Sequence, residues 1–572
     1  MNEPQTQSNG IHRTRLFSGI CLALIPTGAS FSLIASIIPQ LKVEFILTNL
    51  QVGAIAGAAI WGMAISLLVI GPLLEGLGMK KATWAAFLGH LLGVTVMILA
   101  FFFRESPDIA FWVLMLGAAL LAIGNGMIEV SGNPLTASLY TRRKAHMLNI
   151  FHAFFPLGIV LGALIGTFLS RFDPGTFMGH WTFYVGLIYI PVIIYGVMVL
   201  PQKFPKTEGA EAGVPVKEMF RFTLTSPLMY ALLIVMAIAI GLELGIGRWI
   251  PAVYSAVELP GLLMLAWVSG IMMVLRLLSG PILARISPPA LLSVAGLFTC
   301  IGIFLFGIAD TTAMGFLAAT FFGMGVAFFF PTIVGLVAER LPKAGSLGIV
   351  LTCGIGLLSA GTLGNMGVGA LGDRQLASYL DDERRETTIA LLEVITETFP
   401  TYMEEAEAAD NPLEEFGYTR GDVERAMGIA QEALAAFAAD GEIAGTAAPQ
   451  ALRATGGTVF GLSDRIMVAE GHDTAALAAA ELAAAREEFG ERVRAVVEAD
   501  PETVTDFAQQ SIFHAAYLAN TIMGPAEGFA GQRAIKQLAW VPLLLVFFFG
   551  LMFLSDRKKG GYKAVHLEKG GH

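Results

Sequence analysis

Long apolar runs separated by short polar segments dominate the pattern of this sequence. A helix needs on the order of 20 predominantly apolar residues to cross about 30 Å of hydrocarbon. The first run is too long for the apolar core of a removable signal peptide, so we expect it to stay in the protein. The pattern predicts an all-α membrane protein with twelve spanning helices, at 16–41, 50–74, 82–103, 109–138, 147–170, 179–200, 226–254, 260–284, 287–309, 311–338, 345–371 and 534–555.

The composition agrees with lipid as the main solvent. Of the 572 residues 55% are hydrophobic and only 14% are charged, which excludes a water-soluble enzyme. Cys21, Cys300 and Cys353 all lie inside apolar runs, so the sequence predicts neither a disulfide framework nor a zinc site. It also contains no nucleotide-binding loop or nucleophile–base motif. We therefore expect no cofactor, no metal and no nucleic acid partner.

The net charge of −10 conceals a division of the chain. Residues 373–510 hold 29 Asp and Glu against 10 Arg and no Lys, a net charge of −19, whereas the remainder has a net charge of +9. Apolar positions at helical spacing, such as Leu391, Val394 and Ile395, predict helices in this acidic region. The pattern favours a solvated helical insert between spans 11 and 12 over a domain that captures solute.

The loops predict the orientation in the membrane, because Lys and Arg near span ends are retained in the cytoplasm. The basic residues concentrate in one set of connections, whereas the opposite short loops offer only Lys42, Arg104 and Arg171. We therefore expect an inner-membrane protein with both termini cytoplasmic and the insert, 372–533, extracytoplasmic. The basic set comprises Arg13, Arg15, Lys80, Lys81, Arg142, Arg143, Lys144, Lys203, Lys206, Lys217, Arg221, Arg285, Arg340, Lys343, Arg557, Lys558, Lys559, Lys563 and Lys569.

An internal sequence repeat divides the membrane-spanning part into two related bundles. Gly71-Pro72 precedes Gly93 by the same interval that separates Gly280-Pro281 from Gly302, at an offset of 209 residues. Parallel repeats of this kind place a substrate site between the halves near the bilayer midplane. The predicted organisation is an N-terminal six-helix bundle at 1–200, a cytoplasmic linker at 201–225, helices 7 to 11 of the second bundle at 226–371, the insert at 372–533, and helix 12 with the tail at 534–572.

Several motifs resemble those of a known family. Gly71-Pro-Leu-Leu-Glu75-Gly-Leu-Gly78-Met-Lys80-Lys81 resembles the loop 2–3 signature of the major facilitator superfamily. Glu129-Val-Ser-Gly-Asn133-Pro134 and Glu243-Leu-Gly-Ile-Gly-Arg-Trp249 are similar to the fucose–proton symporter branch. The resemblance implies the major facilitator fold and a carrier for a sugar or similar polar solute. Ala35-Ser36 stands where that branch has an acidic residue in span 1, which leaves a facilitative uniporter open.

Two acidic residues, Glu129 and Glu243, lie well inside predicted spans. Intramembrane acids are costly unless they face a cavity or a partner. Glu129, with Asn125 and Asn133 four residues away on either side, is the predicted proton-coupling residue; a neutral packing role is the alternative. Glu243 either lines the substrate cavity or neutralises Arg276 or Arg248.

The remaining candidates are assigned to substrate and gate. The predicted substrate-binding residues are Asn125, Asn133, Asn149, His152, Glu243 and Trp249, since sugars need amides and carboxylates for hydroxyls and an aromatic face for the ring. The predicted cytoplasmic gate comprises Glu75, Arg276, Arg285 and Glu339. Together these features predict a monomeric secondary transporter that works by alternating access with proton symport. The alternatives are a uniporter, an exporter of lipid-like or drug-like solutes, and a receptor that uses the insert as its sensory part.

Overall fold

The computed structural model describes residues 11–45, 49–104, 106–169, 171–172, 176–211, 213–255, 259–383 and 524–565, with scattered positions between 389 and 438, and this described part contains helices and no strand. The predicted insert therefore lies largely outside the described residues. The chain divides into two compact units. One unit, comprising 1–250, 262–367 and 535–572, contains both predicted bundles, and the other comprises 251–261 and 368–534.

The N-terminal half of the first unit corresponds to predicted spans 1 to 6. Its helices α6 and α7 continue through internal prolines, Pro134 and Pro156, and span 2 is interrupted by one π-helical turn, η1. Within it, α5 packs on α6, α2 on α7 and α3 on α6. Its elements are α1 (Arg13–Leu22), α2 (Leu24–Glu44), α3 (Asn49–Ile65), η1 (Ser66–Ile70), η2 (Gly71–Leu73), α4 (Leu74–Leu77), α5 (Met79–Leu99), η3 (Ala100–Phe103), α6 (Pro107–Leu139), α7 (Lys144–Leu169), α8 (Trp181–Gly186) and α9 (Tyr189–Val199).

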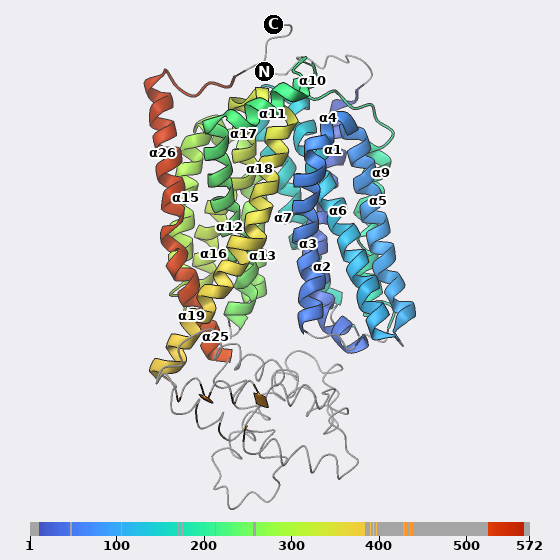
Figure 1. Cartoon of the computed structure of the whole chain (residues 1–572), viewed down its shortest axis with the longest axis vertical. Coiled ribbons are helices and arrows are strands. Elements are labelled where there is room, and N and C mark those ends of the chain that lie inside the picture. Colours follow the sequence, from blue (N-terminus) through green and yellow to red (C-terminus); the bar gives the residue numbers. More distant parts are fainter. Residues whose placement is uncertain are drawn as a thin grey trace, which may run out of the picture. The chain divides into compact units, whose positions relative to one another are not determined.

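The linker and the C-terminal half follow. The linker carries α10 (Glu208–Glu211) and α11 (Val216–Thr225), and in the C-terminal half α15 packs against α16 and α26. The elements of this half are α12 (Pro227–Ser255), α13 (Gly261–Leu277), α14 (Ser279–Leu283), α15 (Pro288–Phe306), α16 (Thr312–Val326), α17 (Phe329–Arg340), η4 (Pro342–Ala344), α18 (Gly345–Ser359), η5 (Ala360–Gly364), α19 (Asn365–Glu383), α25 (Gly524–Gln537), η9 (Leu538–Trp540) and α26 (Pro542–Lys558). Figure 1 shows the two halves as adjacent groups of helices.

Among the described residues, eleven helices are long and apolar enough to cross a membrane, where the sequence predicts twelve. The exception is the predicted span 260–284, which is divided into α13, of 17 residues, and the short α14. Proline has no N–H for the carbonyl four residues before it, and α13 ends at Leu277, four residues before Pro281. The interruption therefore has a local cause in the sequence.

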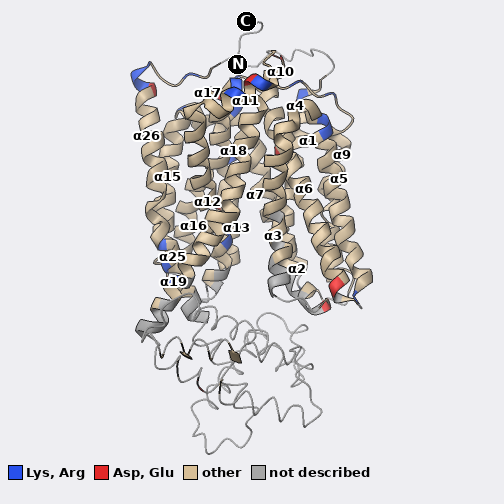
Figure 2. Cartoon of the chain, in the orientation of Figure 1, with Lys and Arg blue, Asp and Glu red and all other residues tan. Residues whose placement is uncertain are grey.

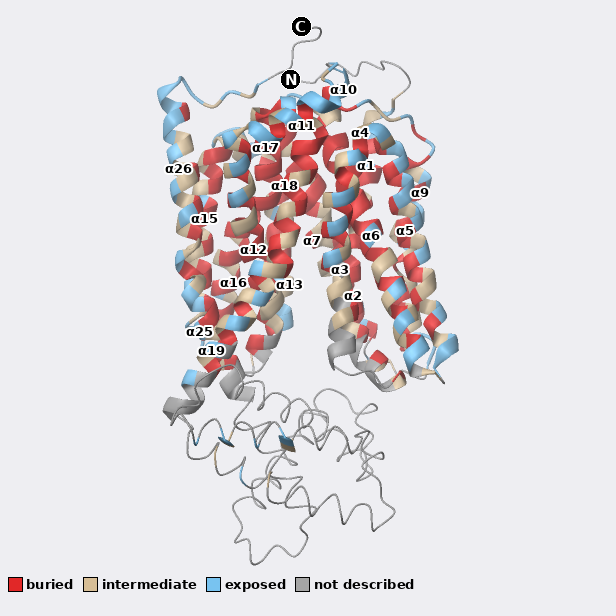
Figure 3. Ribbon diagram, viewed as in Figure 1, coloured by how far each residue is buried: buried red, intermediate tan, exposed pale blue. Residues whose placement is uncertain are grey.

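Burial follows the pattern expected when lipid surrounds the helices. The buried residues gather on the sides of the helices that face other helices, as Figure 3 shows. Large apolar side chains remain exposed elsewhere; for example, Trp112 is 67% exposed and Phe547 is 66% exposed. Exposed apolar surface on this scale is stable in hydrocarbon and not in water.

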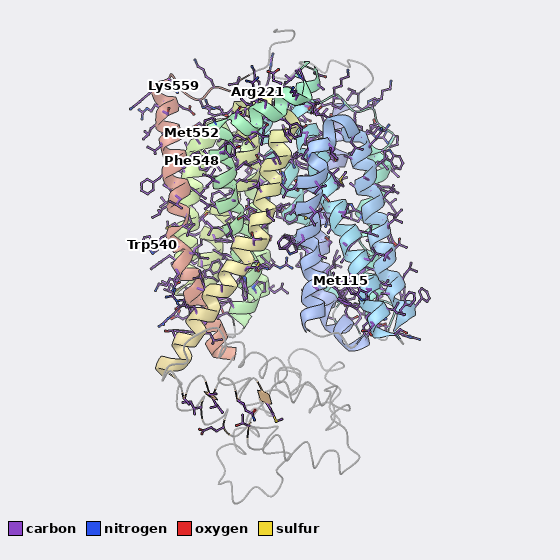
Figure 4. The ribbon with its side chains drawn as sticks, in the orientation of Figure 1. Met115, Arg221, Trp540, Phe548, Met552 and Lys559 are labelled. Carbon is purple, nitrogen blue, oxygen red and sulfur yellow. The ribbon has the colours of Figure 1, made fainter. Side chains whose placement is uncertain are left out.

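Basic residues gather at one end of the first unit, which we call the basic end. It contains the first turn of α1, the start of α5, the α6–α7 connection, the linker and the end of α26, and Figure 2 shows its blue Lys and Arg residues. Arg221 on α11 and Lys559 after α26 mark this end in Figure 4.

The two halves pack closely near the basic end, where α7 contacts α17 and α18 contacts α3. The first glycine of each repeated motif, Gly71 and Gly280, lies in this interface. A Cβ added to Gly71 would lie 2.7 Å from Val350 on α18, and one added to Gly280 would lie 2.9 Å from the ring of His146 on α7. Each repeated motif thus contacts the opposite half, and in each case glycine permits the close approach.

Candidate functional site

The central polar cluster of the N-terminal half comprises Glu129 and Asn133 on α6 and His152 on α7. The Asn133 amide donates to Glu129 Oε2 over 2.6 Å, and His152 Nε2 lies 2.7 Å from Asn133 Oδ1. His152 Nε2 is 3.8 Å from Glu129 Oε2. The spacing of four residues places Glu129 and Asn133 on one face of α6, as expected. In this conformation the three residues are 4%, 0% and 3% exposed, so they are closed off from solvent.

Two prolines free backbone carbonyls beside this cluster. Pro156 lies inside α7 and Pro331 inside α17. Because proline lacks an N–H, the carbonyls four residues earlier, those of His152 and Ala327, lose their helical donors. An unsatisfied carbonyl at membrane depth costs several kcal/mol, so each needs another partner.

Arg276 on α13 supplies both partners. Its Nη1 donates to the His152 carbonyl over 3.0 Å, and its Nε donates to the Ala327 carbonyl over 2.6 Å. Its Nη2 forms an ion pair with Glu243 Oε1 on α12 at 3.2 Å. Arg276 is 2% exposed and joins the C-terminal half to the N-terminal half at the level of Glu129.

These contacts bear on two expectations. Of the two cations considered for Glu243, Arg276 is its partner, while the Arg248 guanidinium lies 6.0 Å from the ring centroid of Phe31. Arg276 was expected among the gate residues at the basic end. The structure instead places it in the central cluster, because the freed carbonyls and Glu243 surround its guanidinium.

The other predicted substrate residues are dispersed. Asn125 belongs to a separate buried set inside the N-terminal half, where His90 Nε2 lies 3.0 Å from its Oδ1. Asn149 donates to Thr332 Oγ1 across the two halves over 3.0 Å. The Trp249 indole donates to the carbonyl of Asn365 over 3.1 Å.

Among the predicted substrate residues, two buried oxygens, Asn149 Oδ1 and Glu243 Oε2, have no hydrogen-bond partner within the described part of the chain. One belongs to each half. Buried acceptors are normally satisfied, so these two atoms require an explanation.

Three of the expected gate residues lie at the basic end, and two of them connect the halves. Glu75 accepts hydrogen bonds from Ser346 on α18 over 2.6 Å and from Thr207 in the linker over 2.8 Å. Glu339 accepts from the backbone N–H of Ala145 over 3.1 Å. Arg285 is exposed in the turn after α14.

Sequence reasoning missed two residues of this end. Lys144, only 1% exposed, donates to Glu208 in the linker and, over 3.0 Å, to the Ala338 carbonyl of the other half. The Tyr562 hydroxyl, in the C-terminal tail, donates to Glu339 Oε2. Both residues lie in basic segments whose composition indicated only the orientation. Across the described ranges, no group of three or more His, Cys, Asp or Glu residues is placed to hold a metal ion.

Comparisons with known proteins agree with this fold. The Major Facilitator Superfamily model matches residues 20–362. The L-fucose-proton symporter of Escherichia coli is 28% identical over 133 residues, which cover 23% of this chain and 29% of that protein. The gentisate transporter of Corynebacterium glutamicum is 24% identical over 176 residues, 31% of this chain and 37% of that protein. The sequence matches thus span about three tenths and somewhat over a third of these relatives.

Among solved structures, the proton:xylose symporter XylE of E. coli superimposes with a TM-score of 0.53 at 14% identity, covering 64% of this chain and 90% of that one. This similarity supports the fold. The resemblance expected from the motifs is confirmed by the family model, which covers more than half of the chain. The protein belongs to the Major Facilitator Superfamily of membrane transporters, and it is not an enzyme.

Proposed function

We propose that the protein moves a small, hydroxyl-rich polar solute, sugar-like in chemistry, across the membrane by alternating access, with proton symport through Glu129. The observation that carries this proposal is the buried Glu129–Asn133–His152 cluster beside the Arg276 bridge between the halves. A carboxyl that is buried in one conformation and opened to water in another is suited to exchanging protons.

The charge count supports Glu129 as the proton carrier. Glu129, Glu243 and Arg276 are all buried, so two carboxyl groups share one guanidinium. Glu243 pairs directly with Arg276, whereas the nearest contact of the Glu129 carboxyl is the neutral Asn133 amide. An uncompensated buried carboxylate is costly, and a bound proton removes that cost. Protonation of Glu129 therefore stabilises the closed state. Exposure of its carboxyl to water in the open state favours release of the proton.

The solute class follows from the orphaned acceptors. Asn149 Oδ1 and Glu243 Oε2 are acceptors that find no donor among the residues the structure describes, one in each half. A solute that carries several hydroxyl groups supplies donors to both as the halves close around it. To the proposed site Asn133 adds an amide, His152 an imidazole and Trp249 an aromatic face. Asn125 would contribute indirectly, through its contact with His90.

The proposed membrane arrangement follows the charges. The basic end faces the cytoplasm, where Glu75, Arg285 and Glu339 belong to the gate region. The helices α13 and α14 together form the eighth span, which brings the number of spans to twelve. The transporter works as a monomer, with the insert 372–533 on the extracytoplasmic side. The positive-inside rule supports this assignment.

Uptake of labelled sugars and other polyols into proteoliposomes, with and without an inward proton gradient, tests the proposal. We expect gradient-driven accumulation of at least one such solute. Glu129→Gln should abolish accumulation while leaving solute exchange, because the variant mimics the protonated carboxyl permanently. Asp108→Asn, on the exposed first turn of the same helix, is the matched control and should accumulate normally.

Two results would contradict proton symport. Accumulation that survives in Glu129→Gln would place the coupling elsewhere. Wild-type uptake that equilibrates without accumulating would favour facilitative uniport, the alternative raised by Ala35-Ser36 in span 1.

A further inference from the structure

Arg276 connects the two halves through backbone carbonyl oxygens that lack a helical donor, because a proline stands four residues after each. In an uninterrupted α-helix the His152 carbonyl would accept from the N–H of residue 156, and the Ala327 carbonyl from that of residue 331. Both of those positions are proline. The freed carbonyls belong to different halves, α7 and the α16–α17 connection, and both accept from the same guanidinium.

The shape of the Arg276 side chain suits this position. A guanidinium is planar and presents several donors in fixed directions. Nε and Nη1 of Arg276 satisfy the two carbonyls, and Nη2 pairs with Glu243 Oε1. Three acceptors from three helical segments thus hold one side chain. A lysine ammonium in the same place has no planar fork with which to reproduce the three directions.

From this geometry we infer that Arg276 is the central clasp of the state closed at the basic end, a positioning residue that links the His152 carbonyl of α7 to the Ala327 carbonyl of the α16–α17 connection. The inference rests on the proposed alternating-access function. The bond from Arg276 to the His152 carbonyl crosses between the halves and must break when the basic end opens. The bonds to Ala327 and Glu243 lie within the C-terminal half and keep the guanidinium oriented for reclosure.

This role differs from a solute ligand or a peripheral gate. Arg276 contacts the backbone of His152, whose ring contacts Asn133 and through it Glu129. The clasp therefore sets the position of the α7 segment whose His152 ring contacts the Asn133–Glu129 pair on α6. Glu243 acts as the counter-ion that makes burial of the guanidinium tolerable, since an unpaired buried charge is strongly destabilising.

Pro156→Ala provides the sharpest test, because it leaves Arg276 and Glu243 unchanged. The new N–H at position 156 competes for the His152 carbonyl within α7 and weakens the bond from Arg276. The matched control is Pro134→Ala, which likewise restores a helical donor inside α6. Arg276→Lys, which keeps the positive charge beside Glu243, tests the donor geometry from the other side.

The distance between the halves is the direct measurement. Spin labels at Lys80→Cys and Lys343→Cys, both exposed at the basic end on opposite halves, report its opening in the full chain after Cys21, Cys300 and Cys353 are replaced by alanine. We expect Pro156→Ala and Arg276→Lys to raise the ratio of long to short distances by about ten-fold, the value of roughly one hydrogen bond from a charged donor. Pro134→Ala should leave the ratio near that of the parent.

Unchanged distance distributions in Pro156→Ala and Arg276→Lys would overturn the clasp, as would an equal shift in Pro134→Ala. A double variant supplies an independent check. In the Arg276→Lys background, Pro156→Ala should add little, whereas independent structural damage would add in full. These measurements need neither solute nor a proton gradient, so a failed transport assay and a failed clasp remain distinguishable.

Discussion

Asn133 connects two buried titratable side chains of the N-terminal half, Glu129 and His152. Its amide nitrogen donates to Glu129 and its oxygen lies within hydrogen-bond distance of His152. Asn133→Leu keeps the side-chain volume but leaves Glu129 and His152 buried without their hydrogen-bond partner. We therefore expect the free energy of unfolding to fall by about 2–4 kcal/mol. Thermal unfolding in detergent measures this loss. Thr136→Val is the control, because the buried Thr136 hydroxyl has no partner in the described part and its loss should be nearly neutral. Equal melting temperatures in the two variants would contradict the assignment.

At the scale of residues, the sequence predicts neighbours along one helix and misses partners across helices. The spacing of Glu129 and Asn133 predicts their contact, but four residues advance an α-helix by about 400°, so the stripe drifts by about 40° at each step. Asn125 is therefore rotated away from Asn133 by about 80°, toward His90. The partners of Arg276 depend on how the halves pack, which the sequence pattern does not contain. Only the two prolines mark the sites of the freed carbonyls.

Among the elements, the tail after α26 extends the gate. The chain turns at Gly560 and Gly561, which have φ of +89° and +99°, and Tyr562 then donates to Glu339 Oε2. The backbone N–H of Val565 donates to the Glu339 carbonyl over 2.8 Å. Glu339 also accepts from Ala145 of the other half, so the tail holds the carboxylate that bridges the halves.

We expect Tyr562→Phe to weaken the closed basic end several-fold, measured as faster alkylation of a cysteine placed at Ser279, which is fully buried beside His146. Burial and the neighbouring Glu339 carboxylate raise the pKa of the Tyr562 phenol, which ordinarily lies at about 10. Below this pKa the Tyr562 hydroxyl keeps its proton and remains a hydrogen-bond donor. The effect of the variant relative to the parent should therefore be constant from about pH 6 to 8. Lys563→Gln is the control. An effect that disappears within this pH range would contradict the hydrogen bond.

Element boundaries were predictable where hydropathy alone sets them. In the part of the chain that the structure describes, the apolar runs correspond to eleven long helices, because each helix must satisfy its own backbone in hydrocarbon. The run at 260–284 is broken because Pro281 removes a donor inside it. The π-helical turns η1 and η5 were not predictable, since they occur in the two segments, α3–η2 and α18–η5, that contact each other across the halves.

At the scale of the whole molecule, the two copies of the repeated motif make related contacts, each with the opposite half. Gly71 in η2 packs against α18, and Gly280 in α14 packs against α7, so each half presents the same motif to the other. Both contacts lie at the basic end. The polar bonds of Glu75 and Glu339 extend this interface, and Arg276 closes it nearer the centre. A single closed end of this kind is one of the two states that alternating access requires.

The charge distribution predicts which compartment this end faces. The start of α1 and the end of α26 share the basic end, and an anionic cytoplasmic leaflet retains Lys and Arg on its own side. In cells that express a cysteine-free parent, Arg104→Cys at the opposite end should react with a membrane-impermeant maleimide in intact cells. Lys80→Cys should react only after permeabilisation, although both positions are exposed. Labelling of Lys80→Cys in intact cells, with Arg104→Cys labelled only after permeabilisation, would contradict this orientation. It would place the basic end outside, together with the gate and the tail bonded to Glu339.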